Sequence, residues 1–205
     1  MLGVEIEVYA DVVCPWCWIG ERRLFKALSG RDDVSVRWRA FQLDPTSAST
    51  GTPLVDWLGR RYGGEANAHR MFDRVTQVAR GEDLTMNFEK AVAANTFDAH
   101  RLIWKAFDLG VQQQMVEALH KAHFTDGLDI GSPAVLSSIA LDLGVPDIAA
   151  SDEGVAEVRA ELKLGRELGV TGVPMFVFNG RYALSGAQDP DTFREALALL
   201  ESPAS

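Results

Sequence analysis

The stretch Asp11-Val12-Val13-Cys14-Pro15-Trp16-Cys17-Trp18-Ile19-Gly20 contains both cysteines of the chain, three positions apart. Residues 4–9, which precede it, alternate apolar and polar side chains with the period of a strand, and helix-forming sequence follows it as far as Leu28. Pro15 suits the first position of a helix, where its missing N–H costs nothing. We therefore predict a strand-to-helix junction in which Cys14 lies just before the helix.

This position gives Cys14 a chemical role. Free N–H groups and the positive end of the helix dipole favour a sulfur anion, and the thiolate is the nucleophilic form of cysteine. Cys17 follows one turn later and can attack a mixed disulfide formed by Cys14. A Cys14–Cys17 bridge would close too short a loop to stabilise the fold much, so the pair indicates chemistry. Asp11 is a candidate proton relay for Cys17, although its charge would also oppose a thiolate.

Length and composition fit a globular protein with one domain, or one domain carrying a large insertion. Of 205 residues, 47 % are hydrophobic and 24 % are charged. The formal net charge of −9 argues against a nucleic-acid partner. Apolar runs are too short to span a bilayer, and the first residues lack the basic start and apolar core of a signal peptide, so we expect no membrane association and a cytoplasmic location.

The remaining sequence predicts an α/β fold. A second strand is expected over residues 33–43, and the Asn179-Gly180 pair between two β-rich runs predicts a hairpin over residues 175–184. Residues 189–200 carry the pattern of a last helix. Between these parts the spacing is helical, with predicted helices over residues 59–83 (one broken stretch), 97–109, 111–124, 133–143 and 151–168.

Several motifs together resemble a known family. The stretch quoted above, the later Gly172-Val173-Pro174 and the helical insertion resemble the DsbA-like branch of the thioredoxin superfamily. Within that branch, Asn95-Thr96-Phe97-Asp98-Ala99-His100-Arg101-Leu102 and Ser185-Gly186-Ala187-Gln188 are similar to the FrnE-type cytoplasmic members. The resemblance implies a thioredoxin fold (βαβ…ββα) made of residues 1–51 and 170–205, with an all-helical domain, residues 52–169, inserted between its halves.

The resemblance also implies an activity, thiol–disulfide exchange on protein or small-molecule disulfides. Cys14 would attack, Cys17 would resolve the mixed disulfide, and Pro15 and Trp16 would complete the motif. A cis Val173–Pro174 bond would face the cysteines and shape the docking surface. No organic cofactor is implied, because the sulfurs carry the electrons, and glutathione is a possible co-substrate. The pair has no His between its cysteines, so we expect a weaker oxidant than a His-containing pair.

The surroundings of the pair are predicted in less detail. The resemblance places Asn95 and His100 in a cleft between the two parts of the fold, although a capped helix start with an ordinary polar His would explain both. Trp18 and Phe41 are candidates for an apolar groove near the sulfurs, or for core positions. Trp16, between the two cysteines, is expected to be partly exposed.

Two other functions and a metal site stay open at this point. One is glutathione-dependent isomerase or transferase activity, as in the kappa-class transferases and chromene carboxylate isomerases, which usually carry Ser at the position of Cys14. The other is a non-enzymatic module that binds a peptide or small molecule. A zinc site would need the Cys pair together with His120 and His123. Because no further Cys is present, we predict no metal and interpret the two histidines as a surface pair.

Overall fold

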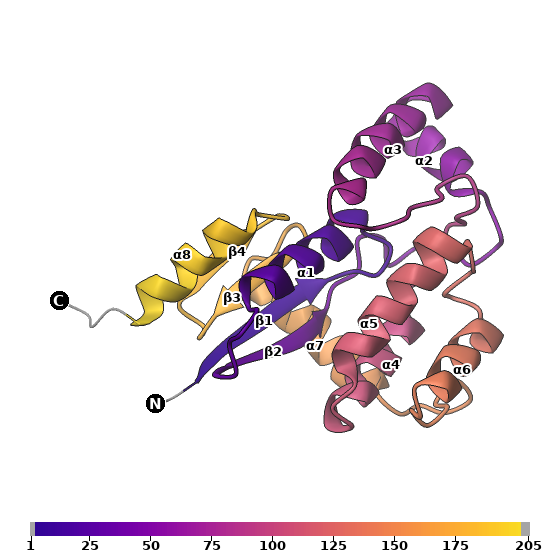
Figure 1. Ribbon diagram of the computed structural model, residues 1–205. Coiled ribbons are helices and arrows are strands. Elements are labelled where there is room, and N and C mark those ends of the chain that lie inside the picture. Colours follow the sequence, from indigo (N-terminus) through magenta and orange to yellow (C-terminus); the bar gives the residue numbers. More distant parts are fainter. Residues whose placement is uncertain (1–2, 202–205) are drawn as a thin grey trace.

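One mixed sheet forms the centre of the computed structural model, which describes residues 3–201 (Figure 1). Its strands are β1 (Val4–Ala10), β2 (Val34–Ala40), β3 (Met175–Phe178) and β4 (Tyr182–Ser185), in the order β2-β1-β3-β4. β1 pairs parallel to β2 and antiparallel to β3, and β3 pairs antiparallel to β4. The helix between β1 and β2 completes the predicted βαβ…ββα order, so the expected α/β thioredoxin fold is confirmed.

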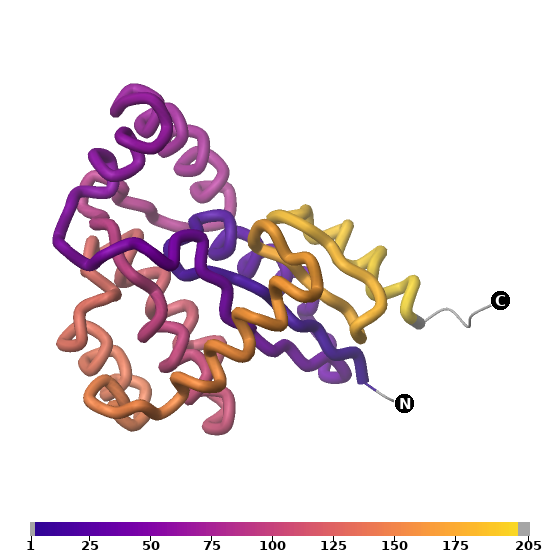
Figure 2. The backbone as a smooth tube through the Cα atoms, turned by 180° about the vertical axis from the view of Figure 1, so that it is seen from behind, coloured from indigo at the N-terminus to yellow at the C-terminus, as the bar shows by residue number. Residues whose placement is uncertain are grey.

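The alternation of side chains along β1 explains how both faces of the sheet are covered. Ile6 and Val8 are fully buried in one core with residues of α1 (Pro15–Ala27) and α8 (Pro190–Glu201). On the same side, Phe176 of β3 packs edge-to-face on Phe193 of α8, with ring centroids 4.7 Å apart. Tyr9 is buried on the opposite face, where Gly165 of α7 (Val155–Glu167) lies against its ring. In Figure 2, which shows the molecule from that side, α7 (orange) crosses in front of the sheet. The sheet is therefore a middle layer between helices.

The hairpin between β3 and β4 follows from its two turn residues. Asn179 and Gly180 both have positive φ angles, 48° and 63°, and the Arg181 N–H donates to the Phe178 carbonyl at 2.9 Å, which closes a tight turn between the paired residues Phe178 and Tyr182. Asn179 also extends the pairing with β1, because its N–H donates to the Glu5 carbonyl at 2.8 Å and its side-chain oxygen accepts the Glu5 N–H at 2.8 Å. The predicted hairpin is confirmed.

Helices occupy the segment between β2 and β3. They are α2 (Leu54–Tyr62), α3 (Glu65–Arg80), α4 (Phe97–Asp108), α5 (Gln112–Lys121), the π-helical turn η1 (Ala122–Asp126), α6 (Pro133–Asp142) and α7. The stretch over residues 59–83 thus contains parts of two helices separated at Gly63-Gly64, and the helix predicted from Ser151 begins only at Val155. The proposed domain limits themselves stay a prediction. Within residues 3–201, no helix is long and apolar enough to cross a membrane.

The arrangement of these helices places two of them next to the cysteines. α4, α5 and α7 contact β2, and α6 packs on α4 and α5. The α2–α3 pair instead stands apart from the sheet, above the N-terminal end of α1 (Figure 1). Its inner side shares a second apolar core with Trp18, Ile19 and Phe124, in which Phe72 of α3 stacks on Phe88 with ring centroids 4.4 Å apart. This core fixes α2 and α3 beside the start of α1.

Candidate active site

Cys14 and Cys17 lie at the N-terminal end of α1, as the sequence predicts. Cys14 is the residue before the helix and has extended backbone angles, and Pro15 occupies the first helical position. The Cys14 N–H donates to the Asp11 carbonyl at 2.9 Å, and the Cys17 N–H donates to the Cys14 carbonyl at 3.0 Å. The Cys14 sulfur therefore lies at the N-terminal end of a helix, where the helix dipole favours negative charge.

A second segment, far away in sequence, faces Cys14. The Val173–Pro174 peptide bond is cis, which confirms the expectation, and the Cys14 Sγ lies 3.7 Å from the Val173 carbonyl oxygen. Gly20 permits this approach, because a Cβ atom there would lie 3.1 Å from both the Pro174 ring and the Phe176 ring. The lack of a side chain at Gly20 therefore lets α1 pack closely on the loop that carries the cis bond.

The two sulfurs differ in their environment. Both cysteines are free thiols; Cys14 is 5 % exposed, and Cys17 is fully buried. Burial raises the pKa of the Cys17 thiol well above its usual value, and the hydrogen bond to Cys14, the Cys14 charge and the Asp11 charge raise it further. Cys17 therefore stays protonated while Cys14, the more accessible sulfur, is the one that an incoming group can reach.

Asp11 is buried at the end of β1 with a limited set of partners. One carboxylate oxygen accepts the Leu43 N–H at 2.7 Å, and the other lies 3.3 Å from Nε2 of His100. The same Nε2 lies 2.8 Å from the Phe41 carbonyl oxygen, which can only accept, so His100 carries its proton on Nε2. This buried carboxylate is thus held by one backbone N–H, and its second oxygen lies beside the imidazole without a hydrogen bond to it.

The prediction that His120 and His123 form a surface pair is wrong. Both side chains are fully buried, and burial lowers the pKa of each to about 4. Nδ1 of His120 lies 3.4 Å from a carboxyl oxygen of Glu21, another buried residue, whose pKa burial raises well above its usual value. Within the described residues, neither carboxyl oxygen of Glu21 and no ring nitrogen of the two histidines has a hydrogen-bond partner. Near neutral pH, these pKa directions favour uncharged forms of all three side chains.

The sequence contained a sign of this burial. Val116, Leu119, His120 and His123 are spaced i, i+3, i+4 and i+7, which is the apolar face of a helix. The first two are core residues, and the histidines continue the same face. The His120 ring and the neighbouring Phe124 ring also stack on Trp18, with centroids 5.8 and 6.1 Å from the centre of its ring. This periodicity indicates buried positions for both histidines.

A cavity of about 370 Å³ lies beside Cys14 and extends beneath α2 and α3. Val13, Pro15 and Val173 form its wall on the sulfur side. The sequence did not predict most of the opposite wall. That wall comes from helices packed near α1, and no local sequence pattern indicates this packing. The aromatic residues that line the cavity are Trp16, Trp57, Tyr62, Phe72, Phe88 and Phe124.

The four residues predicted for the cleft lie outside the wall of this cavity. The Trp18 indole is buried and donates to Glu117 at 2.7 Å, and the half-buried Phe41 offers its backbone carbonyl to His100. Asn95 accepts the Phe97 N–H at 3.0 Å at the start of α4 and donates to the Ser47 carbonyl at 2.8 Å. Direct substrate contact by Trp18, Phe41, Asn95 and His100 stays a prediction; their observed contacts support the surrounding structure.

Two further findings bear on the site. Trp16 is partly exposed and lines the cavity, which agrees with the expected partial exposure. Among residues 3–201, no group of three or more His, Cys, Asp or Glu side chains is placed to hold a metal ion.

Comparisons with known proteins agree with this geometry. The solved structure of a probable DsbA oxidoreductase from Streptomyces coelicolor is 30 % identical, covers 98 % of this chain and 92 % of its own, and superposes with a TM-score of 0.90. The uncharacterized protein YwbO of Bacillus subtilis is 24 % identical over 205 residues, which are 96 % of this chain and 97 % of that protein. The cytosolic disulfide reductase DsbM from Pseudomonas aeruginosa, solved with GSH, shares the fold at 19 % identity and a TM-score of 0.67, with 96 % and 98 % of the two chains covered.

The family assignment rests on most of the chain. Residues 5–198 match the DSBA-like thioredoxin domain, a range that includes the cysteine pair, the helical segment and the cis Val173–Pro174 bond. This chain therefore belongs to the family of DSBA-like thioredoxin domains.

Proposed function

We propose that this protein is a thiol–disulfide oxidoreductase that uses the Cys14–Cys17 pair on protein or small-molecule disulfides. The observation that carries the proposal is the asymmetry of the pair: Cys14 borders a cavity and the cis Val173–Pro174 bond, whereas Cys17 is fully buried behind it. A nucleophile that borders a cavity, backed by a fully buried second thiol, is the arrangement that two-step exchange requires.

The reaction has two steps. The Cys14 thiolate attacks one sulfur of a substrate disulfide, forms a mixed disulfide and releases the other half as a thiolate. Cys17 then loses its proton and attacks the Cys14 sulfur, which releases the second half of the substrate. The protein ends with a Cys14–Cys17 disulfide, and the substrate has gained two electrons; the reverse sequence oxidises a dithiol.

Asp11 is the group that we propose to receive the Cys17 proton in the second step. Its carboxylate raises the pKa of Cys17 by its charge, so the two groups interact, and burial isolates both from bulk water. The 3.3 Å contact with His100 gives this carboxylate a neighbour that can stabilise its charge.

We propose a cytoplasmic location, where a reducing environment would keep the pair mainly as a dithiol. In that compartment, reduction or isomerisation of disulfides is as much expected as net oxidation. Glutathione is a candidate co-substrate, which the structure of the DsbM neighbour with GSH supports at the level of a shared fold.

A Cys17→Ala variant tests the proposal and its main alternative. If the second step is resolution by Cys17, this variant should accumulate a covalent mixed disulfide on Cys14 with added disulfides, and turnover should fall at least a hundredfold. Mass spectrometry of the trapped protein is the measurement, and Cys14→Ser should form no adduct. Glutathione-dependent isomerase or transferase activity that survives in Cys17→Ala would instead favour the alternative. Full cellular function of Cys14→Ser would favour a non-enzymatic binding module.

A further inference from the structure

The cavity beside Cys14 is lined mainly by apolar side chains. Leu54, Leu58 and Trp57 contribute from α2, and Phe72 and Val75 contribute from α3. Its volume of about 370 Å³ falls in the range of sites for small organic ligands, and such sites are mostly apolar. The cavity therefore has the size and the lining of a small-molecule site.

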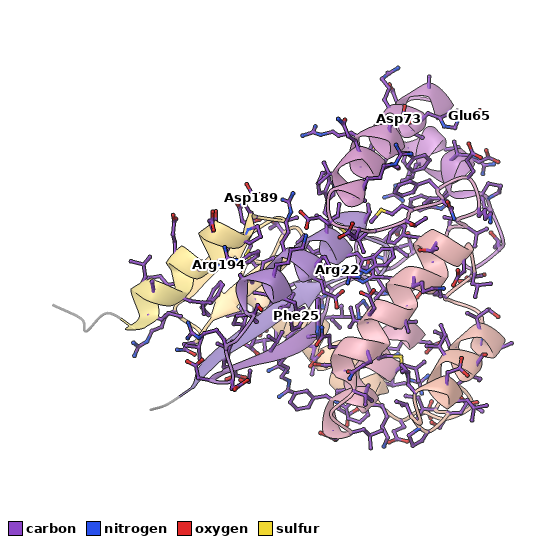
Figure 3. The ribbon with its side chains drawn as sticks, in the orientation of Figure 1. Arg22, Phe25, Glu65, Asp73, Asp189 and Arg194 are labelled. Atoms are coloured by element: carbon purple, nitrogen blue, oxygen red, sulfur yellow. The ribbon has the colours of Figure 1, made fainter. Side chains whose placement is uncertain are left out.

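The wall offers no unpaired charge among the described residues. Its two charged side chains, Asp44 and Arg61, bind each other at 2.6 Å, and the Arg61 guanidinium also lies 4.5 Å from the centre of the Trp57 ring. Charged groups of the α2–α3 pair such as Glu65 and Asp73 lie on its outer part, away from α1 (Figure 3). A ligand with free carboxylates would lose hydration in this cavity without gaining an ionic partner, which is unfavourable.

The recessed position of the sulfur favours a small substrate. Cys14 is only 5 % exposed, and segments from α1, α2, α3 and the Val173 loop surround the space next to it. A disulfide within a folded protein carries two backbones to this sulfur, and both must fit between these segments. A small molecule can enter the cavity and present its disulfide to Cys14.

We propose that this cavity binds the apolar body of an uncharged, low-molecular-weight organic disulfide, and so selects aromatic or aliphatic disulfides over glutathione disulfide. The inference rests on the proposed function. Cys14 and Cys17 together lose two electrons and two protons and form their mutual disulfide, while the substrate R–S–S–R gains them and leaves as two R–SH molecules. One R group occupies the cavity during the mixed-disulfide stage, against Leu58, Phe72 and Val75.

The first test compares reaction rates of the reduced protein with three disulfides. The probes are 4,4′-dithiodipyridine (aromatic and uncharged), 2-hydroxyethyl disulfide (uncharged, without an apolar body) and oxidised glutathione (charged). Each rate constant is divided by that of dithiothreitol with the same probe, which cancels the intrinsic reactivity of the disulfide. We expect the normalised rate for the aromatic probe to exceed the other two at least tenfold. Equal normalised rates for the three probes would overturn the proposal.

Variants then locate the selectivity in the cavity. Leu58→Glu places a carboxylate in the wall and should lower the ratio of aromatic to hydroxyethyl rates at least tenfold. Leu141→Glu, at a 79 % exposed position of α6, is the matched control and should leave the ratio unchanged. If Leu58→Glu does not fold, as judged by circular dichroism, Met71→Glu replaces it, because Met71 lines the cavity and is 42 % exposed. An unchanged ratio in the folded variant contradicts the proposal. The proposal is also contradicted if the variant reduces insulin disulfides more slowly by the same factor, because a protein segment would then be the occupant of the cavity.

A binding measurement separates this proposal from the proposed function. The probe is 1,2-di(4-pyridyl)ethane, which keeps the two rings of the aromatic disulfide but has no S–S bond. It should quench tryptophan fluorescence of Cys14→Ser in a saturable way, with at least tenfold weaker binding when Leu58→Glu is added. Binding without any disulfide exchange by the wild-type protein would reject the proposed function and keep the apolar site. Exchange without this binding would reject the apolar site alone.

Discussion

Asp11 is a buried residue whose charge acts on Cys17, the second cysteine of the pair. It is fully buried, its carboxylate raises the pKa of Cys17, and its neighbours are a backbone N–H from Leu43 and the His100 ring. A charge in this position has two opposite effects on Cys17: it disfavours the thiolate, and it provides an acceptor for the proton. The two effects can be separated experimentally.

Asp11→Asn should lower the pKa of Cys17, because the amide keeps an oxygen for the Leu43 N–H but removes the negative charge. Ultraviolet thiolate absorbance in a Cys14→Ala background measures this titration. If Asp11 also accepts the Cys17 proton, the mixed disulfide on Cys14 should persist longer in Asp11→Asn despite the lower pKa. Asp142→Asn, at an exposed position of α6, is the control. A Cys17 titration unaffected by Asp11→Asn would show that the charge does not reach the thiol.

At the scale of elements, the junction of α1 with the cis-bond loop depends on a glycine. In a helix interior Ala is usually more stable than Gly by about 1 kcal/mol. At Gly20 the added Cβ would lie 3.1 Å from the Pro174 ring and from the Phe176 ring, and Phe176 is fully buried against Phe193. The neighbours have no room to yield, so packing should dominate over helix propensity.

Gly20→Ala is therefore expected to destabilise the protein by about 1 kcal/mol or more, because overpacking of a filled core typically costs about 1–3 kcal/mol. Urea unfolding gives the free energy, and the rate of disulfide exchange should fall with it as the distance between α1 and Val173 changes. Gly172→Ala serves as the control, since nothing lies within 4 Å of a Cβ at that position. A Gly20→Ala protein more stable than the wild type would show that the loop can move.

The helices and strands also show which features can be predicted from the sequence alone. The Cys14 junction, the strands and the Asn179-Gly180 hairpin are local patterns, and all were predictable. The late start of α7 was not, because its cause is distant in sequence: the buried Arg101 side chain binds the backbone carbonyls of Ile148, Ser151 and Glu153 and holds this segment in an irregular form. The cavity escaped prediction for the same reason, since its walls meet only in the folded protein.

At the scale of the whole molecule, the buried histidines connect folding stability to pH. His120 and His123 have folded-state pKa values of about 4 against an ordinary value of 6.5, so the unfolded chain takes up protons first as the pH falls. Stability from this source is present above pH 6.5 and is lost between pH 6.5 and 4. One pKa unit corresponds to about 1.4 kcal/mol, which gives about 3 kcal/mol for each ring. Glu21, with its raised pKa, has the opposite effect and destabilises the protein as the pH rises above 4.5.

His123→Gln should therefore reduce the loss of unfolding free energy between pH 6.5 and 4. Chemical denaturation at a series of pH values measures the slope. His69→Gln provides the control, because His69 is exposed and its replacement should leave the slope unchanged. A slope that is the same in His123→Gln and the wild type would mean that the buried ring does not contribute to the acid sensitivity.

The proposed activity depends on reversible electron exchange between the two sulfurs of one pair. A redox titration of the wild-type protein against reduced and oxidised glutathione, with peptide mapping of each sample, tests this most directly. We expect one reversible two-electron transition, with a Cys14–Cys17 disulfide on the oxidised side and the folded dithiol on the reduced side. A folded protein whose cysteines stay free thiols at every ratio, or end only as separate glutathione adducts, would contradict it.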